Sequence, residues 1–317
     1  MSDLCNDQGR AFEYICLLKL DEEIRKFRPA TIIQNSSYYA AQHAWNSVSQ
    51  IMQSKLTKGA EAMISAVFEM EPLIIENAQD TLELFIQPDA AGKAGDVRDI
   101  IVKRSNIQWE IGFSIKHNHF AVKHSRLSYK LDFGNKWYGI PCTNDYWNAV
   151  TPVFNYLKAE NRKGTLFDNL PNKSNNVYVP ILQAFIDEIN RQNHTHPDFP
   201  IRMVEYLLSK YDFYKVVSID RDKMTYIQPF NVHGKLNKPS RQSQPTIIVP
   251  QTDLPSRLVT MKFVPGHDNT VELYFDKGWS FSFRIHNAEK EVVPTLKFDI
   301  QLIGMPVSIM TINCIWR

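Results

Sequence analysis

The amino-acid sequence predicts an α/β (α+β) fold, in which a mixed sheet is flanked by helices and followed by a C-terminal, mostly antiparallel β region. Three observations lead to this prediction. Apolar residues have helical spacing over about the first seventy residues, short β-type runs follow up to residue 116, and seven more β-type runs come after residue 213. With 317 residues, 44% of them hydrophobic, the chain can bury one large core or two smaller ones.

The N-terminal part is predicted to be mainly helical. Residues 9–27 and 40–68 each place apolar side chains three and four positions apart, which is the spacing of one helix face. Residues 82–87 then alternate between apolar and polar side chains, as a strand does, and residues 88–95 are rich in loop formers. The sheet therefore begins near residue 82.

Two β-type runs, 99–104 and 109–116, are separated by the polar residues 105–108 and are predicted to form a hairpin. Helical spacing returns after a loop at 133–141, with Asn144 and Asp145 as the expected cap of the next helix. Two more helices are expected at 178–191 and 201–210, with a turn at 193–198 between them.

Seven short strands are predicted in the last third of the chain, and together they suggest a second, mostly antiparallel layer. The polar run 231–245 among them is expected to be a loop that is mobile or ordered by a partner. The predicted strands are 214–219, 224–230, 246–249, 258–264, 270–275, 279–285 and 296–303.

Composition excludes several classes of protein. The formal charge is only +2, so affinity for a polyanion would depend on how the charges are arranged. The four cysteines have no C-x-x-C pair or regular spacing, which argues against a zinc site and against a secreted disulfide framework. No uninterrupted apolar run is long enough to cross a membrane, and the polar N-terminus does not resemble a signal peptide, so we expect a cytoplasmic protein.

The predicted hairpin brings together residues that suit phosphodiester hydrolysis. Pairing places Asp99 opposite Phe113 or Ser114, while Ser114 and Lys116 share a face about 7 Å apart. Glu110 lies about 20 Å from Lys116 along the strand and is discounted as a catalytic carboxylate. One end of the hairpin is therefore a candidate site.

Cutting a phosphodiester requires a cation to offset the charge of the transition state, and oxygen ligands favour magnesium. Asp99 is the principal candidate ligand, with the carbonyl of Ile115 and the hydroxyl of Ser114 as neutral additions. Lys116 is a candidate to orient or deprotonate the attacking water or to contact a phosphate oxygen. The residues alone leave these roles for Lys116 open.

The pattern D-x14-S-x-K resembles the core motif of the PD-(D/E)xK nucleases, with Ser114 where an acid is usual. In many members of that superfamily the first helix opens with G-x-x-F-E and its glutamate points at the metal, and Gly9 to Glu13 is similar to that opening. The resemblance therefore implies Glu13 as the second metal ligand and catalytic residue. Asp96 is a third candidate because it lies near the entrance of the strand.

Hydrogen-bond donors crowd the chain directly after Lys116. Between residues 103 and 136 there are seven Lys or Arg side chains against two acids, enough to contact several phosphates of a DNA duplex. The candidate DNA-binding residues of this stretch are Asn118, His119, Lys123, His124, Arg126 and Ser128.

Six longer blocks carry a closer resemblance, and they are residues 95–102, 109–119, 122–128, 131–137, 279–288 and 294–302. They are similar to blocks of type II restriction endonucleases of the HaeIII-like family. This resemblance extends from about residue 9 to residue 303. It implies a restriction-endonuclease-like fold and Mg²⁺-dependent cleavage of both strands of DNA at a short palindrome, GGCC. It also implies a bacterial restriction-modification system whose DNA methyltransferase protects the host DNA.

On this basis residues 1–165 are expected to hold the catalytic core, 166–213 a helical connection and 214–317 a β-rich DNA-recognition region; the three can pack as one continuous domain. Arg and Lys side chains suit guanine, and acids or amides suit cytosine and adenine. The candidate base-contacting residues of the last region are Arg241, Arg284, His286 and Asn287. The residues leave open whether Arg284 is instead an ordinary surface charge.

Three other functions remain open. His117, His119 and His124 suggest a histidine-metal (HNH-like) nuclease, although the bracing cysteines of such sites are absent. Ser114 in the acidic position suggests a DNA-binding protein without activity. A repair or resolving nuclease would recognise DNA shape rather than sequence. Whether one chain cuts both strands in turn or two chains act as a homodimer is also open.

Overall fold

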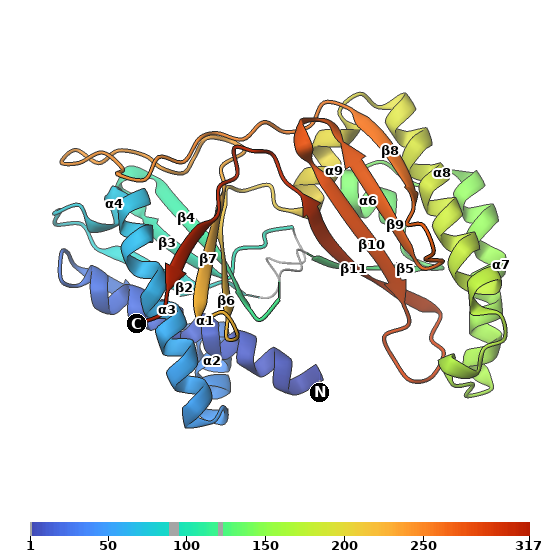
Figure 1. Cartoon of the computed structure of the whole chain (residues 1–317), viewed down its shortest axis with the longest axis horizontal. Helices are drawn as coiled ribbons and strands as arrows, with labels where there is room; N and C mark the ends of the chain where they lie inside the picture. Colours follow the sequence, from blue (N-terminus) through green and yellow to red (C-terminus); the bar gives the residue numbers. More distant parts are fainter. Residues whose placement is uncertain (1, 89–94, 120–122) are drawn as a thin grey trace. The chain divides into compact units, whose positions relative to one another are not determined.

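A computed structural model describes residues 2–88, 95–119 and 123–317, and the chain divides into two packing units. The first unit contains residues 1–120, 209–252 and 307–317, and the second contains residues 121–208 and 253–306. Each unit has its own sheet and its own helices (Figure 1). These two packing units do not coincide with the three consecutive segments expected from the sequence, 1–165, 166–213 and 214–317. The functions assigned to those segments stay predictions.

The first unit is built on a mixed sheet with the strand order β1-β2-β3-β4-β6-β7-β12. β1 is parallel to β2 and β4 is parallel to β6, while the other neighbours are antiparallel. The mixed sheet that the sequence predicts is therefore confirmed. Its strands are β1 (Ala30–Ile32), β2 (Leu82–Ile86), β3 (Ile100–Arg104), β4 (Trp109–His117), β6 (Phe213–Ile219), β7 (Met224–Phe230) and β12 (Ile312–Ile315).

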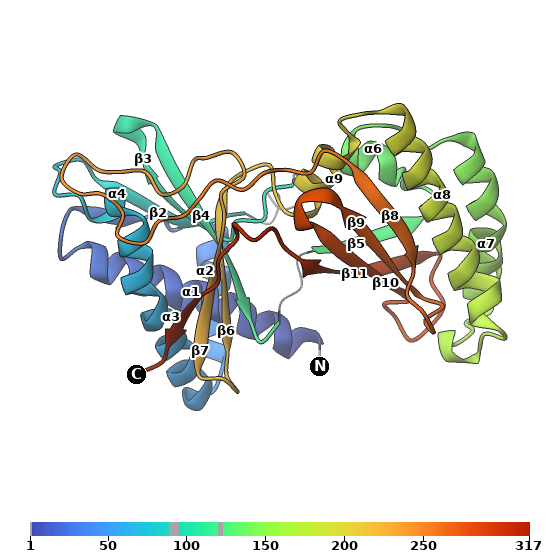
Figure 2. The same ribbon diagram turned by 45° about the horizontal axis from the view of Figure 1, so that its top comes forward.

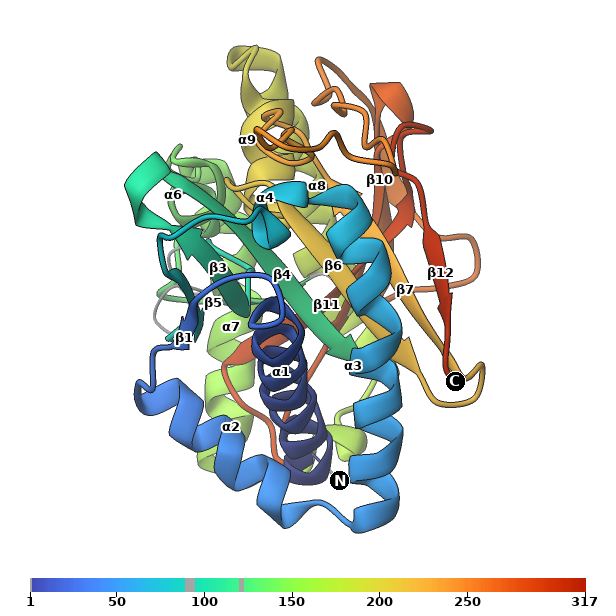
Figure 3. The ribbon, with the colours of Figure 1, turned by 90° about the vertical axis from the view of Figure 1, so that its left-hand side faces the viewer.

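Helices α1 (Ser2–Ile24) and α3 (Gln50–Met70) lie across one face of this sheet (Figure 3), with α2 (Ser36–Ser47) against α1 and the short α4 (Pro72–Ile75) after α3. The single helix predicted at 40–68 is two helices, because Val48 is extended and ends α2. The Ser49 hydroxyl then accepts a hydrogen bond from the Met52 amide and caps α3.

The core of the first unit lies between these helices and the sheet. Phe12 on α1, Val67 on α3, Phe113 on β4 and Tyr214 on β6 are all fully buried. Gly59 permits α3 to approach closely, since a Cβ at this position would lie 2.5 Å from the Ser218 hydroxyl. No helix in the part of the chain that the structure describes is long and apolar enough to cross a membrane.

The second unit is built on an antiparallel sheet with the order β5-β11-β10-β9-β8. Four of its strands match the predicted runs that begin at residues 258, 270, 279 and 296, whereas β5 was not predicted. The bounds are β5 (Lys123–Ser128), β8 (Leu258–Phe263), β9 (Thr270–Phe275), β10 (Ser280–His286) and β11 (Thr295–Gly304).

Helices cover one face of this antiparallel sheet (Figure 2). Phe283 and Phe298 extend from β10 and β11 and pack around Phe185 of α8, with ring centroids 5.6 and 5.2 Å away, and around Trp137 of α6. These aromatic residues form the core of the second unit. The helices are α6 (Phe133–Tyr138), α7 (Asn144–Arg162), α8 (Val179–Thr195) and α9 (Phe199–Leu207).

Several local predictions are wrong. The expected loop at 133–141 contains α6, which Asp132 caps and Gly139 ends in a left-handed conformation (φ 74°). Helix α7 is capped by Thr143, one residue before the predicted pair Asn144 and Asp145. The predicted loop at 88–95 lies mostly outside the described residues. Single-turn helices also occur at Ser105–Ile107, Phe167–Asn169, Ser174–Tyr178 and Asp276–Gly278.

The predicted second β layer is also only partly correct. The strands β6 and β7 join the sheet of the first unit instead, because β6 pairs with β4. Residues 246–249 are not a strand. The run 231–245 before them is anchored to the chain itself, since the Asn237 amide donates to the carbonyls of Met70 and Ile247 and its backbone N–H donates to Glu71.

Candidate active site

The candidate site lies on the hairpin of β3 and β4. In the register of the hairpin, Ile100 pairs with Phe113 and Arg104 pairs with Trp109. The backbone N–H of Asp99 donates to the Phe113 carbonyl over 2.7 Å, so Asp99 continues the ladder opposite Ser114. Gln108 closes the turn in a left-handed conformation with φ 51°. The predicted hairpin and its register are confirmed.

Asp99 and Lys116 form an ion pair in this hairpin. The Asp99 Oδ2 atom accepts hydrogen bonds from the Lys116 ammonium over 2.9 Å and from the Ile115 backbone N–H over 2.6 Å. The Ser114 hydroxyl lies 3.5 Å from the same oxygen. The Asp99 and Lys116 side chains remain 25% and 21% exposed, so a substrate can reach both.

The Lys116 ammonium also donates to the Ile115 carbonyl over 3.0 Å. The two atoms that the sequence predicts as magnesium ligands, Asp99 Oδ2 and Ile115 O, thus already converge on one cationic group. A carboxylate and a carbonyl are hard oxygen donors of the kind magnesium takes, and magnesium keeps several waters. The donor set fits this ion, although no cluster of three or more His, Cys, Asp or Glu side chains occurs among the described residues.

Glu13 acts on this pair electrostatically from α1. Burial lowers the pKa of Lys116, but Asp99 and then Glu13 raise it more, so the pKa lies above its ordinary value and the side chain carries a charge at neutral pH. α1 packs on β4, where the Phe12 ring lies 6.1 Å from the His117 ring. The glutamate that the family resemblance implied therefore lies in the electrostatic surroundings of Lys116.

Asp96, the third candidate ligand, is committed to a different contact. Both of its carboxylate oxygens accept hydrogen bonds from Arg98, which also donates to Glu110 over 2.9 Å. Arg98 crosses β4 at Gly112, where a Cβ would lie 2.2 Å from the Arg98 Cδ atom. Asp96 and Glu110 thus hold the arginine rather than face the Asp99 carboxylate.

Lys215 is a residue of this site that was not predicted. It lies on β6 directly beside Ser114 in the parallel ladder and is 4% exposed. Burial, and then the charge of Lys116, lower its pKa to about 7. A lysine inside the apolar run of residues 213–217 was the one sign in the sequence that this residue is unusual. No local pattern shows that this run lies beside β4.

His117 is buried and braces the end of β4. Its Nε2 atom lies 2.8 Å from an Asp220 carboxylate oxygen and 3.2 Å from the Asn118 amide. Asn118 Oδ1 in turn accepts from the Asp220 backbone N–H, which connects β4 to the turn between β6 and β7. These contacts disfavour the histidine-metal alternative for His117. They give Asn118 a structural role beside its predicted contact with DNA.

The candidate DNA-binding residues on β5 are divided by the alternation of the strand. Lys123 faces inward, where its ammonium lies 3.7 Å from the centre of the Tyr206 ring, whereas Arg126 is exposed. The Ser128 hydroxyl accepts from the backbone N–H groups of Lys130 and Leu131. His124 pairs with Asp299 through the backbone of β11, and His119 is exposed after the end of β4.

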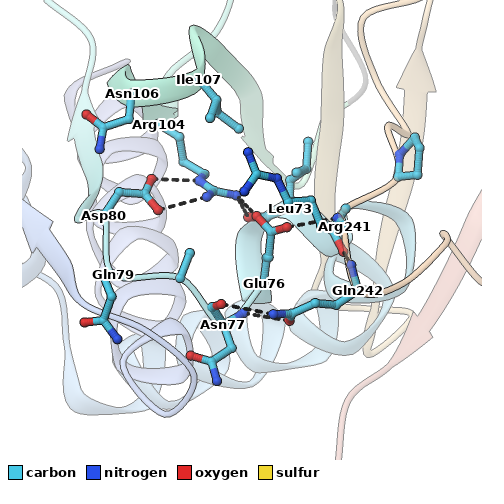
Figure 4. Close-up of a pocket in the computed structure, with 13 residues that line it drawn as sticks. Leu73, Glu76, Asn77, Gln79, Asp80, Arg104, Asn106, Ile107, Arg241 and Gln242 are labelled. Carbon is cyan, nitrogen blue, oxygen red and sulfur yellow. Dashed lines mark hydrogen bonds and ion pairs between the residues drawn. The ribbon is translucent and has the colours of Figure 1, made fainter.

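Arg241 lies at a pocket of about 540 Å³ in the first unit (Figure 4). Its backbone N–H donates to Glu76, and Gln242 contacts the backbone of Asn77. Arg104 in the same pocket forms ion pairs with Glu76 and Asp80. Glu76 and Asp80 thus compensate the charge of Arg104 within the pocket. The contacts of Arg241 and Gln242 with Glu76 and Asn77 anchor the 231–245 run.

The last three candidates lie at one end of β10. Arg284 is exposed and donates to Asp299 over 2.8 Å, and His286 Nδ1 lies 3.6 Å from the same carboxylate. The Asn287 amide donates to the carbonyls of Glu289 and Glu291, so this side chain shapes its own loop. The contact of Asn287 with a base stays a prediction.

Comparisons with known proteins show the family of this chain. The family model of the HaeIII restriction endonuclease matches residues 9–306. The type II restriction enzyme HaeIII of Haemophilus aegyptius is 46% identical over 318 residues, which cover 100% of both chains. No solved structure matches. The family match and this relative show that the chain is a type II restriction endonuclease, an enzyme that cuts DNA at specific sites. Within that class, the chain belongs to the HaeIII restriction endonuclease family.

Proposed function

We propose that this enzyme cuts both strands of DNA at GGCC in a reaction that depends on Mg²⁺. One observation carries the proposal: Asp99, the Ile115 carbonyl and the Lys116 ammonium meet at one end of the β3–β4 hairpin, where the two side chains remain partly exposed. The recognition sequence is the one that the family resemblance implies. Asp99 and the Ile115 carbonyl would hold the ion, and Glu13 would support the site from α1.

Mg²⁺ bound there would stabilise the negative charge that develops on the phosphate and lower the pKa of a bound water. Lys116 has a pKa above its ordinary value, so it remains an ammonium at neutral pH. An ammonium can hydrogen-bond a phosphate oxygen and orient the attacking water. We therefore propose charge stabilisation and positioning as its role.

Substitution of Asp99 tests this proposal. With Mg²⁺ and DNA of known sequence, the wild-type enzyme is expected to give fragments whose ends map to GGCC. The rate of DNA cleavage by Asp99→Ala is expected to be lower than that of wild type by at least about 10³-fold, because a ligand of the ion is lost. Duplex binding, measured in EDTA by gel retardation, should be retained, since a negative charge near the phosphates is removed.

Glu110→Gln is the matched control. Glu110 lies on the same hairpin and is 42% exposed, but it contacts Arg98 rather than Lys116. This variant should cut at the wild-type rate. Full cleavage by Asp99→Ala, or cleavage by the wild-type enzyme without any divalent ion, would contradict the proposed site.

We further propose that the enzyme acts in the bacterial cytoplasm, beside a DNA methyltransferase that modifies the same sequence. DNA treated with that methyltransferase should resist cleavage. To cut both strands, one chain must act twice or two chains must act as a homodimer. A nicked plasmid that accumulates before the linear product would show sequential cutting, and linear product without a nicked intermediate would show concerted cutting.

A further inference from the structure

In the described part of the chain, helices cover one face of the antiparallel sheet of the second unit, and no helix lies against the other face (Figure 2). Phe281, Phe283 and Ile285 of β10 point toward the helices and are fully buried. On the other side of the strand, Ser282, Arg284 and His286 are partly or fully exposed. The same alternation occurs in β11, where Phe298 and Ile300 are buried. A strand that is apolar on one side and charged on the other presents its polar side to solvent or to a partner.

Charged side chains gather at one end of this face, around Asp299. The register places Arg284 opposite Asp299 and His286 opposite Lys297 on the two neighbouring strands. Arg284 donates to Asp299 Oδ2 over 2.8 Å, and the Lys297 ammonium lies 3.9 Å from Asp299 Oδ1. We call Arg284, His286, Lys297 and Asp299 the Asp299 cluster. Arg284 is 60% exposed, so the cluster is open to a ligand.

The chemistry of this cluster suits base edges better than phosphates. A surface that only binds phosphates gains nothing from a carboxylate at its centre, because the two negative charges repel. In the major groove a guanine presents two acceptors, and its cytosine partner presents an amino donor. Arginine or lysine beside an acid is therefore complementary to a G·C pair, and a GGCC site contains only such pairs.

We propose that the Asp299 cluster reads a G·C pair in the major groove of the DNA substrate, with Arg284 and Lys297 as donors to guanine. Asp299 holds the Arg284 guanidinium in place and offers an acceptor toward the cytosine amino group. This inference rests on the proposed function, because it takes duplex DNA with a G·C-containing site as the ligand. It assigns specificity to Lys297 and Asp299, which the sequence did not indicate.

The inference predicts a coupling between one protein side chain and one base atom. Duplexes are prepared in which each guanine of the site is replaced in turn by 7-deazaguanine, which lacks the N7 acceptor. Wild-type binding in EDTA should weaken about 10- to 100-fold at the guanine that Arg284 contacts. Arg284→Ala should bind the unmodified site more weakly than wild type does, by a similar factor. Its affinity for the duplex modified at that guanine should be little lower than its affinity for the unmodified duplex.

Asp299→Asn tests the acid. This variant keeps the shape of the side chain but loses the charge that holds Arg284. Its preference for the cognate duplex over a duplex with one changed base pair should fall about tenfold or more. Lys262→Ala is the matched control, because Lys262 is an exposed cation of the same sheet on β8 and pairs with Glu272. It should keep the wild-type preference.

Circular dichroism and thermal unfolding show whether each variant is folded. Two results overturn the inference. One is that the effects of Arg284→Ala and of 7-deazaguanine are additive at every position of the site. The other is that folded Asp299→Asn loses affinity equally for all duplexes. Failure of the proposed function looks different, since wild-type enzyme would then cut no DNA with Mg²⁺, whereas binding preference is measured without cleavage.

Discussion

At the scale of single residues, the chemistry of the candidate site depends on the groups around the Lys116 ammonium. Lys116 contacts the Asp99 carboxylate and the Ile115 carbonyl, and Glu13 adds a further negative charge. Ser114 lies where the nuclease motif that this hairpin resembles usually has an acid, so fewer carboxylates would surround the proposed ion. The two groups that Lys116 contacts, the Asp99 carboxylate and the Ile115 carbonyl, are also the two proposed magnesium ligands.

Loss of the Lys116 ammonium should slow the chemical step. Lys116→Ala is expected to lower the single-turnover cleavage rate by about 10²- to 10⁴-fold, which is the usual contribution of a positioned catalytic group. Lys116→Arg should not restore the rate, because a planar guanidinium cannot replace a compact ammonium. Binding affinity in EDTA serves as the control. A rate within a few-fold of wild type would remove Lys116 from the mechanism.

Lys215 should make stability depend on pH. Its pKa is about 7 in the folded chain, against an ordinary value of 10.5. Between these values the unfolded chain binds a proton that the folded chain does not, so this residue makes stability rise with pH from about 7 to about 10. Below pH 7 the folded chain carries the full cost of the buried charge.

Lys215→Met should remove this cost. The variant is expected to be more stable than wild type at pH 6, by about 1.4 kcal/mol for each unit of pKa shift, and the difference should shrink at pH 9. Urea unfolding at the two pH values measures both free energies. An equal loss of stability at pH 6 and pH 9 would show that Lys215 is instead a stabilising member of the core.

At the scale of elements, the alternation of β5 decides which cations can meet DNA. Arg126 and Lys123 lie on the same strand at positions of opposite parity, so they point to opposite faces. Arg126 is exposed, while Lys123 lies against Tyr206, where burial and then Lys136 lower its pKa to about 8. The basic composition of the stretch gave no sign of this difference.

Arg126→Ala should therefore weaken binding to all duplexes by a similar factor. The plot of the logarithm of the binding constant against the logarithm of the salt concentration should become less steep by about one unit, because one phosphate contact is lost. Lys123→Met should leave that slope unchanged. A loss confined to the cognate sequence in Arg126→Ala would reassign this side chain from the DNA backbone to a base.

Helix and strand positions were largely predictable at this scale, and their boundaries were not. Apolar spacing located α1, α3 and α8, and alternation located most strands of both sheets. The break at Val48 and the cap at Thr143 depend on a single backbone angle and a single hydroxyl, which periodicity does not detect. β1 and β12, of three and four residues, are too short to show alternation.

At the scale of the whole molecule, each packing unit depends on distant parts of the chain. The first unit takes its strands β6 and β7 from residues 209–252 and β12 from the last eleven residues. β12 covers the open edge of β7, and the Trp316 indole N–H donates to the Thr225 hydroxyl. The C-terminal segment therefore completes the sheet that holds the site.

Deletion of residues 307–317 should destabilise the first unit although it removes no residue of the site. The expected result is a lower midpoint of thermal unfolding and loss of cleavage at temperatures where wild type is active, because an edge strand and its buried side chains are lost. Ile315→Thr is the control, since Ile315 is 69% exposed. An unchanged midpoint in the deletion would show that β12 contributes nothing to the unit.

The sequence by itself determined the fold class, the β3–β4 hairpin and the pairing of Asp99 with Lys116. These features depend on local alternation and on two strands joined by a short turn, so neighbouring residues are enough to specify them. Only the tertiary structure decided that β6 brings Lys215 beside Ser114 and that β5, paired with the distant β11, turns Lys123 inward. Such pairings join segments that are far apart in the chain, and the choice of partner strand depends on packing of the whole core rather than on any local pattern.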